Sequence, residues 1–447
     1  MPYIYERAKG VIVSLRRVVL GEDSKLTTEP LMKPGWYSID TTWYLSNADY
    51  WRRVWIIQEC SLARNLTVMT GAQTFTWAEF ISQIKSSPEL KDSIPMRLHR
   101  QIEQKYTDGH KLQTLLENYQ NALCKDPRDK VYGFIGLASD TLEGFPMDYR
   151  KTLFEVWKDT MMFKNADIET SRHDIMRFGK LVRKTLGGKG IATEEEIRQD
   201  ISLRLDAAAE IIDRNERPLW PTTISIPGLL IGRINYLGPS YVEIISDLKQ
   251  TAVWRSNINK YIPEYERAHT RERSDVFLQD LEEMEDEDLR VIVDYDCGKM
   301  MSLISWKIDS KPESIVMVER NCSTQAFDSR SVGSPGVSRL FLLGGRSSSE
   351  RPTINMGLAP SSARPGDFVC QIHALEKAVV VRYDPAAELL ILVGTAALPR
   401  NRDEVVGVDE RKLGRGTKFK TAFFDFIPDS ENLDLFMDVA MAYQLLD

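Results

Sequence analysis

The segment from Trp51 to Ala63 reads Trp-Arg-Arg-Val-Trp-Ile-Ile-Gln-Glu-Cys-Ser-Leu-Ala, and it is the stretch from which the fold of the N-terminal region can be predicted. Large side chains recur there at helical spacing, at Trp51, Val54, Trp55, Gln58 and Leu62. This pattern predicts a helix over about Ala48 to Arg64 with one face buried in a core.

Elements on either side of this helix mix strand and helix patterns. Val11 to Leu15 predicts a buried strand, and Leu66 to Met69 predicts a short second one. Thr76 and Glu79 have the spacing of a capping box that opens a further helix. Leu112 to Asn121 predicts another helix, so we expect an α/β arrangement in this region.

The length of 447 residues, 43% of them hydrophobic, predicts two or three domains. We place a first domain at 1–150, a helical region at 151–222 and a mostly β region at 223–447. In the helical region we expect helices over 151–164, over 171–186, where Gly187-Gly188 ends the helix, and from Thr193 to about Asn215. Within the last, Ser225–Asn235, Ser314–Glu319, Asp367–Ile372, Ala378–Arg382 and Leu389–Val393 predict strands. An insert with an acidic run lies between the first two strands, and the composition of 329–365 predicts a flexible linker.

The composition also bounds the class of protein. A net charge of −7 argues against general nucleic-acid binding, which requires a basic face. No apolar run is long enough to span a bilayer, and the N-terminus does not have the pattern of a secretory signal. The five cysteines and five histidines are scattered, so we expect no metal site, reduced thiols and a cytoplasmic location.

Three segments, taken together and in order, resemble the fungal heterokaryon-incompatibility (HET) domain family. Ile4 to Leu15 resembles the helix-to-strand segment Y-x-x-A-x-x-V-x-V-x-L, and Trp51 to Ala63 resembles the W-x-R-x-W-x-x-Q-E-x-x-L-A helix. Asp126 to Gly133, followed by Leu137-Ala138 and Asp148-Tyr149, resembles the D-P-R-D-K-V-Y-G…L-A…D-Y signature. The family's opening S-Y-x-W-G and W-x-D-x-x-C-I-N-Q motifs do not occur, so we interpret 1–150 as the later part of such a domain.

The resemblance implies a function and a fold. HET proteins act in fungal non-self recognition and programmed cell death, and their partners are other proteins, among which we include further copies of the same chain. The family is thought to be related to TIR domains, so the fold expected for 1–150 is part of a TIR-like doubly wound sheet. An alternative is an accessory or regulatory protein that is associated with a metabolic gene cluster and has no catalytic role.

The TIR relationship also implies a candidate active site. Some TIR domains cleave NAD with the glutamate of a W-x-x-x-E helix, and Trp55 to Glu59 has that spacing, with Tyr50 five residues before the tryptophan. Under this alternative Glu59 is catalytic, Tyr50 and Trp55 contact the ligand, and NAD is a substrate; no other cofactor is expected. A carboxylate there could bind ribose hydroxyls or stabilise positive charge as a glycosidic bond breaks.

A structural interpretation competes with each of these assignments. Tyr50 and Trp55 have the character of core aromatics, and Glu59 could pair with a nearby arginine. In the cluster from Asp126 to Lys130, Asp126 or Asp129 would cap a helix while Arg128 forms a buried bidentate ion pair, although a charged contact site is the functional alternative. We favour the structural interpretation in both cases, and an enzymatic activity stays uncertain.

Overall fold

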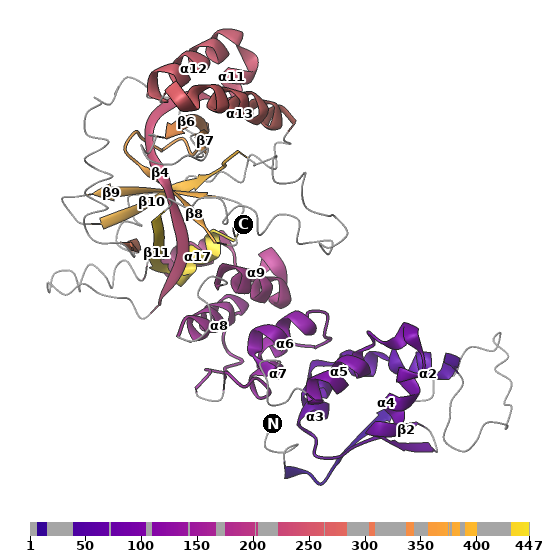
Figure 1. Ribbon diagram of the computed structural model, residues 1–447. Helices are drawn as coiled ribbons and strands as arrows, with labels where there is room; N and C mark the ends of the chain where they lie inside the picture. Colours follow the sequence, from indigo (N-terminus) through magenta and orange to yellow (C-terminus); the bar gives the residue numbers. More distant parts are fainter. Residues whose placement is uncertain are drawn as a thin grey trace. The chain divides into compact units, whose positions relative to one another are not determined.

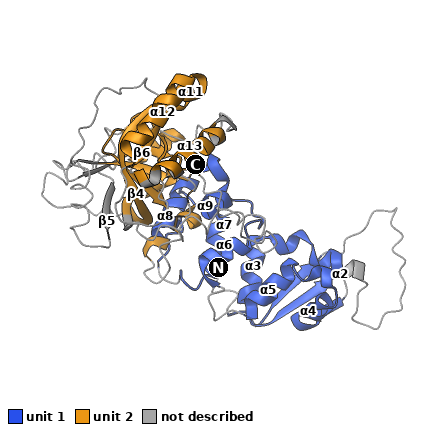
Figure 2. Cartoon of the chain, turned by 45° about the horizontal axis from the view of Figure 1, so that its top comes forward, with its two compact units in different colours: residues 1–163, 180–192 blue, residues 164–179, 193–447 orange. Residues whose placement is uncertain are grey.

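The computed structural model describes residues 7–15, 39–70, 73–103, 110–141, 144–166, 175–201, 203, 222–262, 264–283, 304–308, 337–343, 356–373, 375, 378–384, 389–399 and 431–446. The chain forms two compact units (Figure 2). Unit 1 comprises residues 1–163 and 180–192, and unit 2 comprises residues 164–179 and 193–447. The three predicted domains differ from these units, because the helical middle of the chain contributes residues to both.

Unit 1 contains a small mixed sheet with the strand order β1-β2-β3. Strand β1 (Val11–Leu15) is parallel to β2 (Leu66–Thr70), and β2 is antiparallel to β3 (Gln73–Thr76). Helices lie between β1 and β2 in the chain, as a parallel connection requires. The strands expected at 11–15 and 66–69 are confirmed, whereas a doubly wound TIR-like sheet stays a prediction.

The helices of unit 1 follow the predicted order with some shifts at their ends. Thr76 caps α4 with the reciprocal Glu79 hydrogen bonds expected of a capping box. The single helix predicted over 48–64 is divided, because Arg53 is extended between a 3-10 turn and an α-helix. The helices are α2 (Ile39–Ser46), η1 (Asp49–Arg52), α3 (Val54–Leu62), α4 (Trp77–Lys85), η2 (Pro88–Leu90), α5 (Ile94–Glu103), α6 (Leu112–Asn118), α7 (Asp129–Ile135) and η5 (Gly188–Ile191).

Helices α8 (Leu153–Ala166) and α9 (Ile175–Leu186) each contribute residues to both units. They correspond to the helices predicted over 151–164 and 171–186; the first residues of the second prediction lie outside the described ones. Gly187 and Gly188, with φ of 136° and 79°, end α9 as expected, because glycine tolerates positive φ at a helix C-terminus. The helix predicted from Thr193 is present over 194–201.

Unit 2 is built around a curled antiparallel sheet in which β4 (Thr223–Ser240) is the central long strand (Figure 1). The first half of β4 pairs with β11 (Glu431–Asp438) and β8 (Phe368–Ile372), and its second half pairs with β6 (Arg339–Leu343). Register shifts along β4 mark the bulges that let one strand serve both sets of neighbours. The other strands are β5 (Ile304–Ile308), β7 (Met356–Ala359), β9 (Ala378–Asp384) and β10 (Leu389–Ala396).

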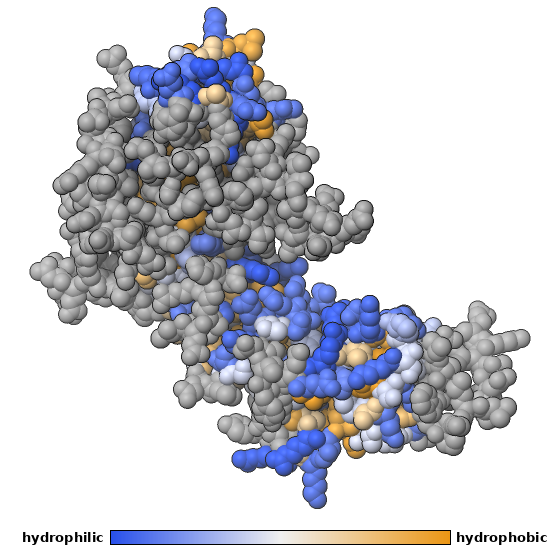
Figure 3. All heavy atoms as spheres, in the orientation of Figure 1, coloured by the Kyte–Doolittle hydropathy of each residue, from blue (hydrophilic) through white to orange (hydrophobic). Residues whose placement is uncertain are grey.

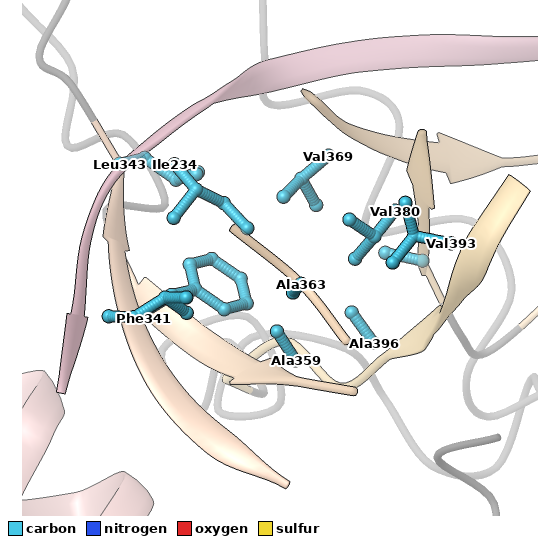
Figure 4. Close-up of a cluster of buried hydrophobic side chains, with 11 residues drawn as sticks. Ile234, Phe341, Leu343, Ala359, Ala363, Val369, Val380, Val393 and Ala396 are labelled. Atoms are coloured by element: carbon cyan, nitrogen blue, oxygen red, sulfur yellow. The ribbon is translucent and has the colours of Figure 1, made fainter. Parts of the chain in front are cut away.

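The concave side of this sheet encloses an apolar core (Figure 4). Side chains from strands far apart in the sequence point into it, among them Ile234, Phe341, Val369, Val380 and Val393, all at 0% exposure. Because β4 and the later strands β6 to β10 all contribute, this core fastens the C-terminal strands to β4.

Three helices, α11 (Tyr241–Ser246), α12 (Leu248–Tyr261) and α13 (Glu264–Glu283), follow β4 and form the described part of the predicted insert. They pack on β6 and β7 through a second apolar cluster that includes Trp254, whose indole donates to Ser274 over 2.7 Å. Exposed apolar side chains lie on the outer surface around α11 and α12 (Figure 3), at Val242, Ile245, Leu248 and Val253. Part of the predicted acidic run lies on α13 and the rest lies outside the described residues.

The composition of 329–365 predicts a flexible linker, but the structure has strand β6 at 339–343 and strand β7 at 356–359; residues 329–336 and 344–355 lie outside the described ones. Both strands are almost fully buried, and they pair with each other over Arg339–Leu342 and Met356–Ala359. The short apolar runs that form them are flanked by Ser-, Gly- and Pro-rich sequence, and that flanking composition led to the linker prediction. The strand predicted at 314–319 lies outside the described residues.

Candidate functional site

Helix α3 carries the candidates Trp55 and Glu59, and Tyr50 lies in the preceding turn η1. Backbone hydrogen bonds to Leu123, in the segment before α7, hold the start of α3 in place. The backbone N–H of Val54 donates to Leu123 O at 3.1 Å, and the N–H of Leu123 donates to Arg52 O at 2.6 Å. Nearly every side chain of the helix is buried, so α3 is a central element of unit 1 rather than a surface helix.

Trp55 reaches the second signature segment directly. Its indole Nε1 donates to Asp129 Oδ2 at 3.2 Å, across 74 positions of sequence. The other oxygen of the same carboxylate, Oδ1, accepts a hydrogen bond of 2.7 Å from the Tyr149 hydroxyl. Asp129 therefore joins α3, the start of α7 and the Asp148-Tyr149 pair, and each of these belongs to a segment that resembles the family.

Arg128 reinforces the same region. Its guanidinium donates to both oxygens of Asp126, at 2.9 and 2.8 Å, and also to the carbonyl oxygens of Tyr149 and Lys151. These bonds lower the pKa of the Asp126 carboxyl, chiefly through the hydrogen bonds from the arginine. Arg128 also lies 5.7 Å from the centre of the Tyr149 ring, at cation–π distance.

The predicted ion pair of Arg128 is thus confirmed as bidentate, but it is only partly buried, with the two side chains 26% and 29% exposed. Arg128, which directly precedes α7, provides no side-chain cap, but Asp126 accepts from the backbone N–H of Arg128 at 3.0 Å and so caps the turn that leads into the helix. The Asp129 carboxylate accepts instead from an indole and a phenol.

Gly133 allows α3 and α7 to approach closely. A Cβ atom at this position would overlap Cγ1 of Val54, so any larger residue would force the two helices apart. Val54 and Gly133 are both part of the resembling segments, and their contact is a packing relationship rather than a chemical one.

Tyr50 and Glu59 are the other two candidate residues, and the charge of Glu59 affects the ionisation of Tyr50. Burial, together with the charges of Cys60 and Glu59, raises the pKa of Tyr50 to about 12, while Arg53 opposes this rise. Glu59 is half-buried, as is Trp55. The structure therefore brings two of the three candidates, Tyr50 and Glu59, within electrostatic reach, whereas the indole nitrogen of Trp55 is engaged with Asp129.

Trp51 has the structural role that its spacing predicts. It is fully buried, it donates from Nε1 to Leu45 O at 2.7 Å, and it stacks on Phe80 with ring centres 5.7 Å apart. Arg52 pairs with Asp49 at 3.4 Å. The aromatic stripe of this segment is thus mainly core, with Trp55 as its link to α7.

Cysteine chemistry is disfavoured at this helix. Cys60 is 1% exposed, and burial raises the pKa of its thiol well above the usual range, so the thiolate needed for nucleophilic attack is suppressed. No group of three or more His, Cys, Asp or Glu residues suited to a metal ion occurs among the described residues. None of the helices in the described part combines the length and apolar character that crossing a bilayer demands.

Sequence reasoning did not connect Trp55 with Asp129 or Asp129 with Tyr149. All three residues belong to segments that resemble the HET family, which was the one sequence feature that linked them. The spacing of residues along the chain does not show which side chains come into contact. The arrangement is a polar junction around a carboxylate whose two oxygens both accept hydrogen bonds. Comparisons of the chain with models of protein families, with curated proteins and with solved structures found no match.

Proposed function

We propose that this chain is a heterokaryon-incompatibility-type protein that takes part in fungal non-self recognition and programmed cell death through contacts with other proteins. The observation that supports the proposal is the hydrogen bond from Trp55 to Asp129. It joins the two most specific of the resembling segments, so the motif residues have a shared structural reason to occur together.

The position of the first resembling segment adds support. It includes β1, which pairs in parallel with β2 directly after α3. A strand, intervening helices and a parallel strand are what part of a TIR-like sheet would contain. The Trp55–Asp129 junction would then maintain the shape of an effector domain rather than carry a reaction.

The experiment is regulated expression in a filamentous fungus, with cell viability as the readout. The wild-type chain is expected to kill, and Trp55→Phe, which keeps the ring but removes the donor to Asp129, is expected to kill less. Trp43→Phe is the matched control, since that indole is 46% exposed. Harmless expression of the wild type would contradict the proposal and favour the accessory role.

A second candidate function is cleavage of NAD with Glu59 as the catalytic carboxylate. The observation that favours it is that the charge of Glu59, a half-buried carboxylate, raises the pKa of Tyr50. In such a reaction water replaces nicotinamide at the ribose carbon, and the carboxylate would stabilise the positive charge that develops there.

This alternative is tested by incubating the purified chain with NAD and measuring released nicotinamide. Glu59→Gln should abolish the release, and Glu89→Gln, at an exposed position, should leave it unchanged. If the wild type releases no nicotinamide, or if Glu59→Gln releases as much as the wild type, the proposed enzymatic function of Glu59 is wrong. Neither result would contradict the cell-death proposal.

A further inference from the structure

Strand β1 forms one edge of the sheet in unit 1. Among the described residues it pairs only with β2, in parallel over Val11–Leu15 (Figure 1, where β1 is indigo). No strand in the described part of the chain pairs with its second edge, so the backbone N–H and C=O groups there could bind another strand.

The side chains of β1 alternate between two environments. Val13 and Leu15 are buried at 0% and 3% exposure, and they belong to the face of the sheet that forms the core. Ile12 is 65% exposed on the opposite face, where Met69 of the adjacent strand is 36% exposed. The outer face thus has an apolar side chain at its very edge.

Natural edge strands are usually protected by charged side chains, proline or bulges. Strand β1 has the sequence Val-Ile-Val-Ser-Leu, without charge or proline, and its pairing with β2 runs through all five residues without a register shift. Nothing within the strand itself opposes the addition of a further strand.

The sequence of β1 is suited to pairing with itself. If two copies run antiparallel about a two-fold axis at Ile12, the two Ile12 side chains lie opposite each other and Val11 lies opposite Val13 of the second copy. Gly10 then faces Ser14, and Lys9 faces Leu15, so no like charges meet over residues 9–15. An axis at Val13 would instead set Ile12 against Ser14, which buries less apolar surface.

We propose that β1 binds the β1 strand of a second copy of this chain, so that two three-stranded sheets become one six-stranded sheet with Ile12 on the two-fold axis. The interface is isologous, as expected for a two-fold dimer. Both core faces continue across the junction, because the axis is perpendicular to the sheet. This inference does not depend on the proposed function.

The test is the oligomeric state of the purified full chain by sedimentation equilibrium. A contact of this size gives dissociation constants in the micromolar range or weaker, so the series should extend from about 1 to about 500 µM. The wild type should form dimers within this range. Ile12→Lys and Ile12→Glu should each weaken dimerisation about tenfold or more, because like charges then meet on the axis.

An equimolar mixture of Ile12→Lys and Ile12→Glu should recover dimers, since the charges that meet are then opposite. This recovery distinguishes pairing at Ile12 from general disruption of the sheet. Met69→Lys adds the same charge to the same face but one strand further from the edge, and it should dimerise like the wild type. Circular dichroism verifies that each variant is folded.

A measurement on the wild type alone completes the test. Amide exchange over Val11–Leu15 should slow as the protein concentration rises, because the open edge becomes hydrogen-bonded in the dimer. A wild type that stays monomeric through the series overturns the proposal. So does a dimer that Ile12→Lys leaves as tight as before, because that dimer would use another surface.

Discussion

The hydroxyl of Tyr149 donates a hydrogen bond of 2.7 Å to Oδ1 of Asp129, although the tyrosine side chain is 48% exposed and the aspartate only 9%. Burial raises the pKa of Tyr149 above its usual value, and the bond to Asp129 raises it further, so the phenol remains a donor at neutral pH. A surface residue thus satisfies a carboxylate that lies mostly inside unit 1.

We expect Tyr149→Phe to destabilise unit 1 by about 1 kcal/mol, because the bond is to a charged group but is partly screened by solvent. The measurement is urea-dependent hydrogen exchange of peptides from α3 and α7, which reports on unit 1 separately. Tyr44→Phe, at a tyrosine that is 39% exposed, is the control. Equal losses in the two variants would mean that the Asp129 bond contributes nothing.

The contact of Gly133 with Val54 leads to a prediction about packing. Gly133→Ala should destabilise unit 1 by about 1 to 3 kcal/mol, because the new methyl group overlaps Cγ1 of Val54. Val54→Ala removes the overlapping atom, so the double variant should be less destabilised than the sum of the single variants. Gly190→Ala, with no atom within 4 Å of the added Cβ, should have little effect. Strict additivity of the first two changes would contradict the contact.

Features set by neighbouring residues could be predicted from the sequence. Thr76 and Glu79 form their capping box because both partners lie within one turn, and Gly187 ends its helix for a similarly local reason. The junction of Trp55 with Asp129 could not be predicted in the same way, since the partners are 74 residues apart and only tertiary packing selects them.

Strands β6 and β7 show a different limit of sequence reasoning. Residues 339–343 and 356–359 are short apolar runs inside a polar stretch. They are too short to predict strands when the surrounding composition is typical of a loop. They become strands because β4 continues past its pairing with β8 and offers a second half for β6 to join. The candidate site stays a prediction: Glu59 affects the ionisation of Tyr50, while the indole of Trp55 donates to Asp129, a partner that the sequence did not indicate.

The ionisation of Tyr50 gives a prediction at high pH. Its pKa of about 12 lies above the value near 10 of an unfolded tyrosine, so its contribution to stability is fully present below pH of about 10 and is lost as the pH rises through about 12. Tyrosine-labelled NMR, with Tyr50→Phe for assignment, measures this pKa directly. Glu59→Gln should lower it, because the carboxylate disfavours the phenolate, whereas Glu89→Gln should not. If the pKa of Tyr50 is unchanged in Glu59→Gln, the two candidate residues do not interact electrostatically.

In unit 2, Arg382 and Asp367 form a bidentate ion pair, with Nε to Oδ1 and Nη2 to Oδ2 both at 2.8 Å. Asp367 is 3% exposed at its side chain and also accepts a bond of 2.7 Å from the N–H of Arg364. Arg382→Met should destabilise unit 2 by about 3 to 5 kcal/mol, because it leaves a buried carboxylate without its cation. Exchange of peptides from β8 and β9 in urea measures this loss.

The pH dependence of that variant has a definite sign. Burial raises the pKa of Asp367, while Arg382 lowers it, so removing the arginine raises the pKa further. A folded carboxyl with a raised pKa binds more protons than its unfolded form, and stability then falls as the pH rises. The Arg382→Met variant should therefore regain stability as the pH falls from 7 towards 5, and Asp367→Asn combined with it should remove that dependence. A loss that stays constant over this range would show that the Asp367 charge is not its cause.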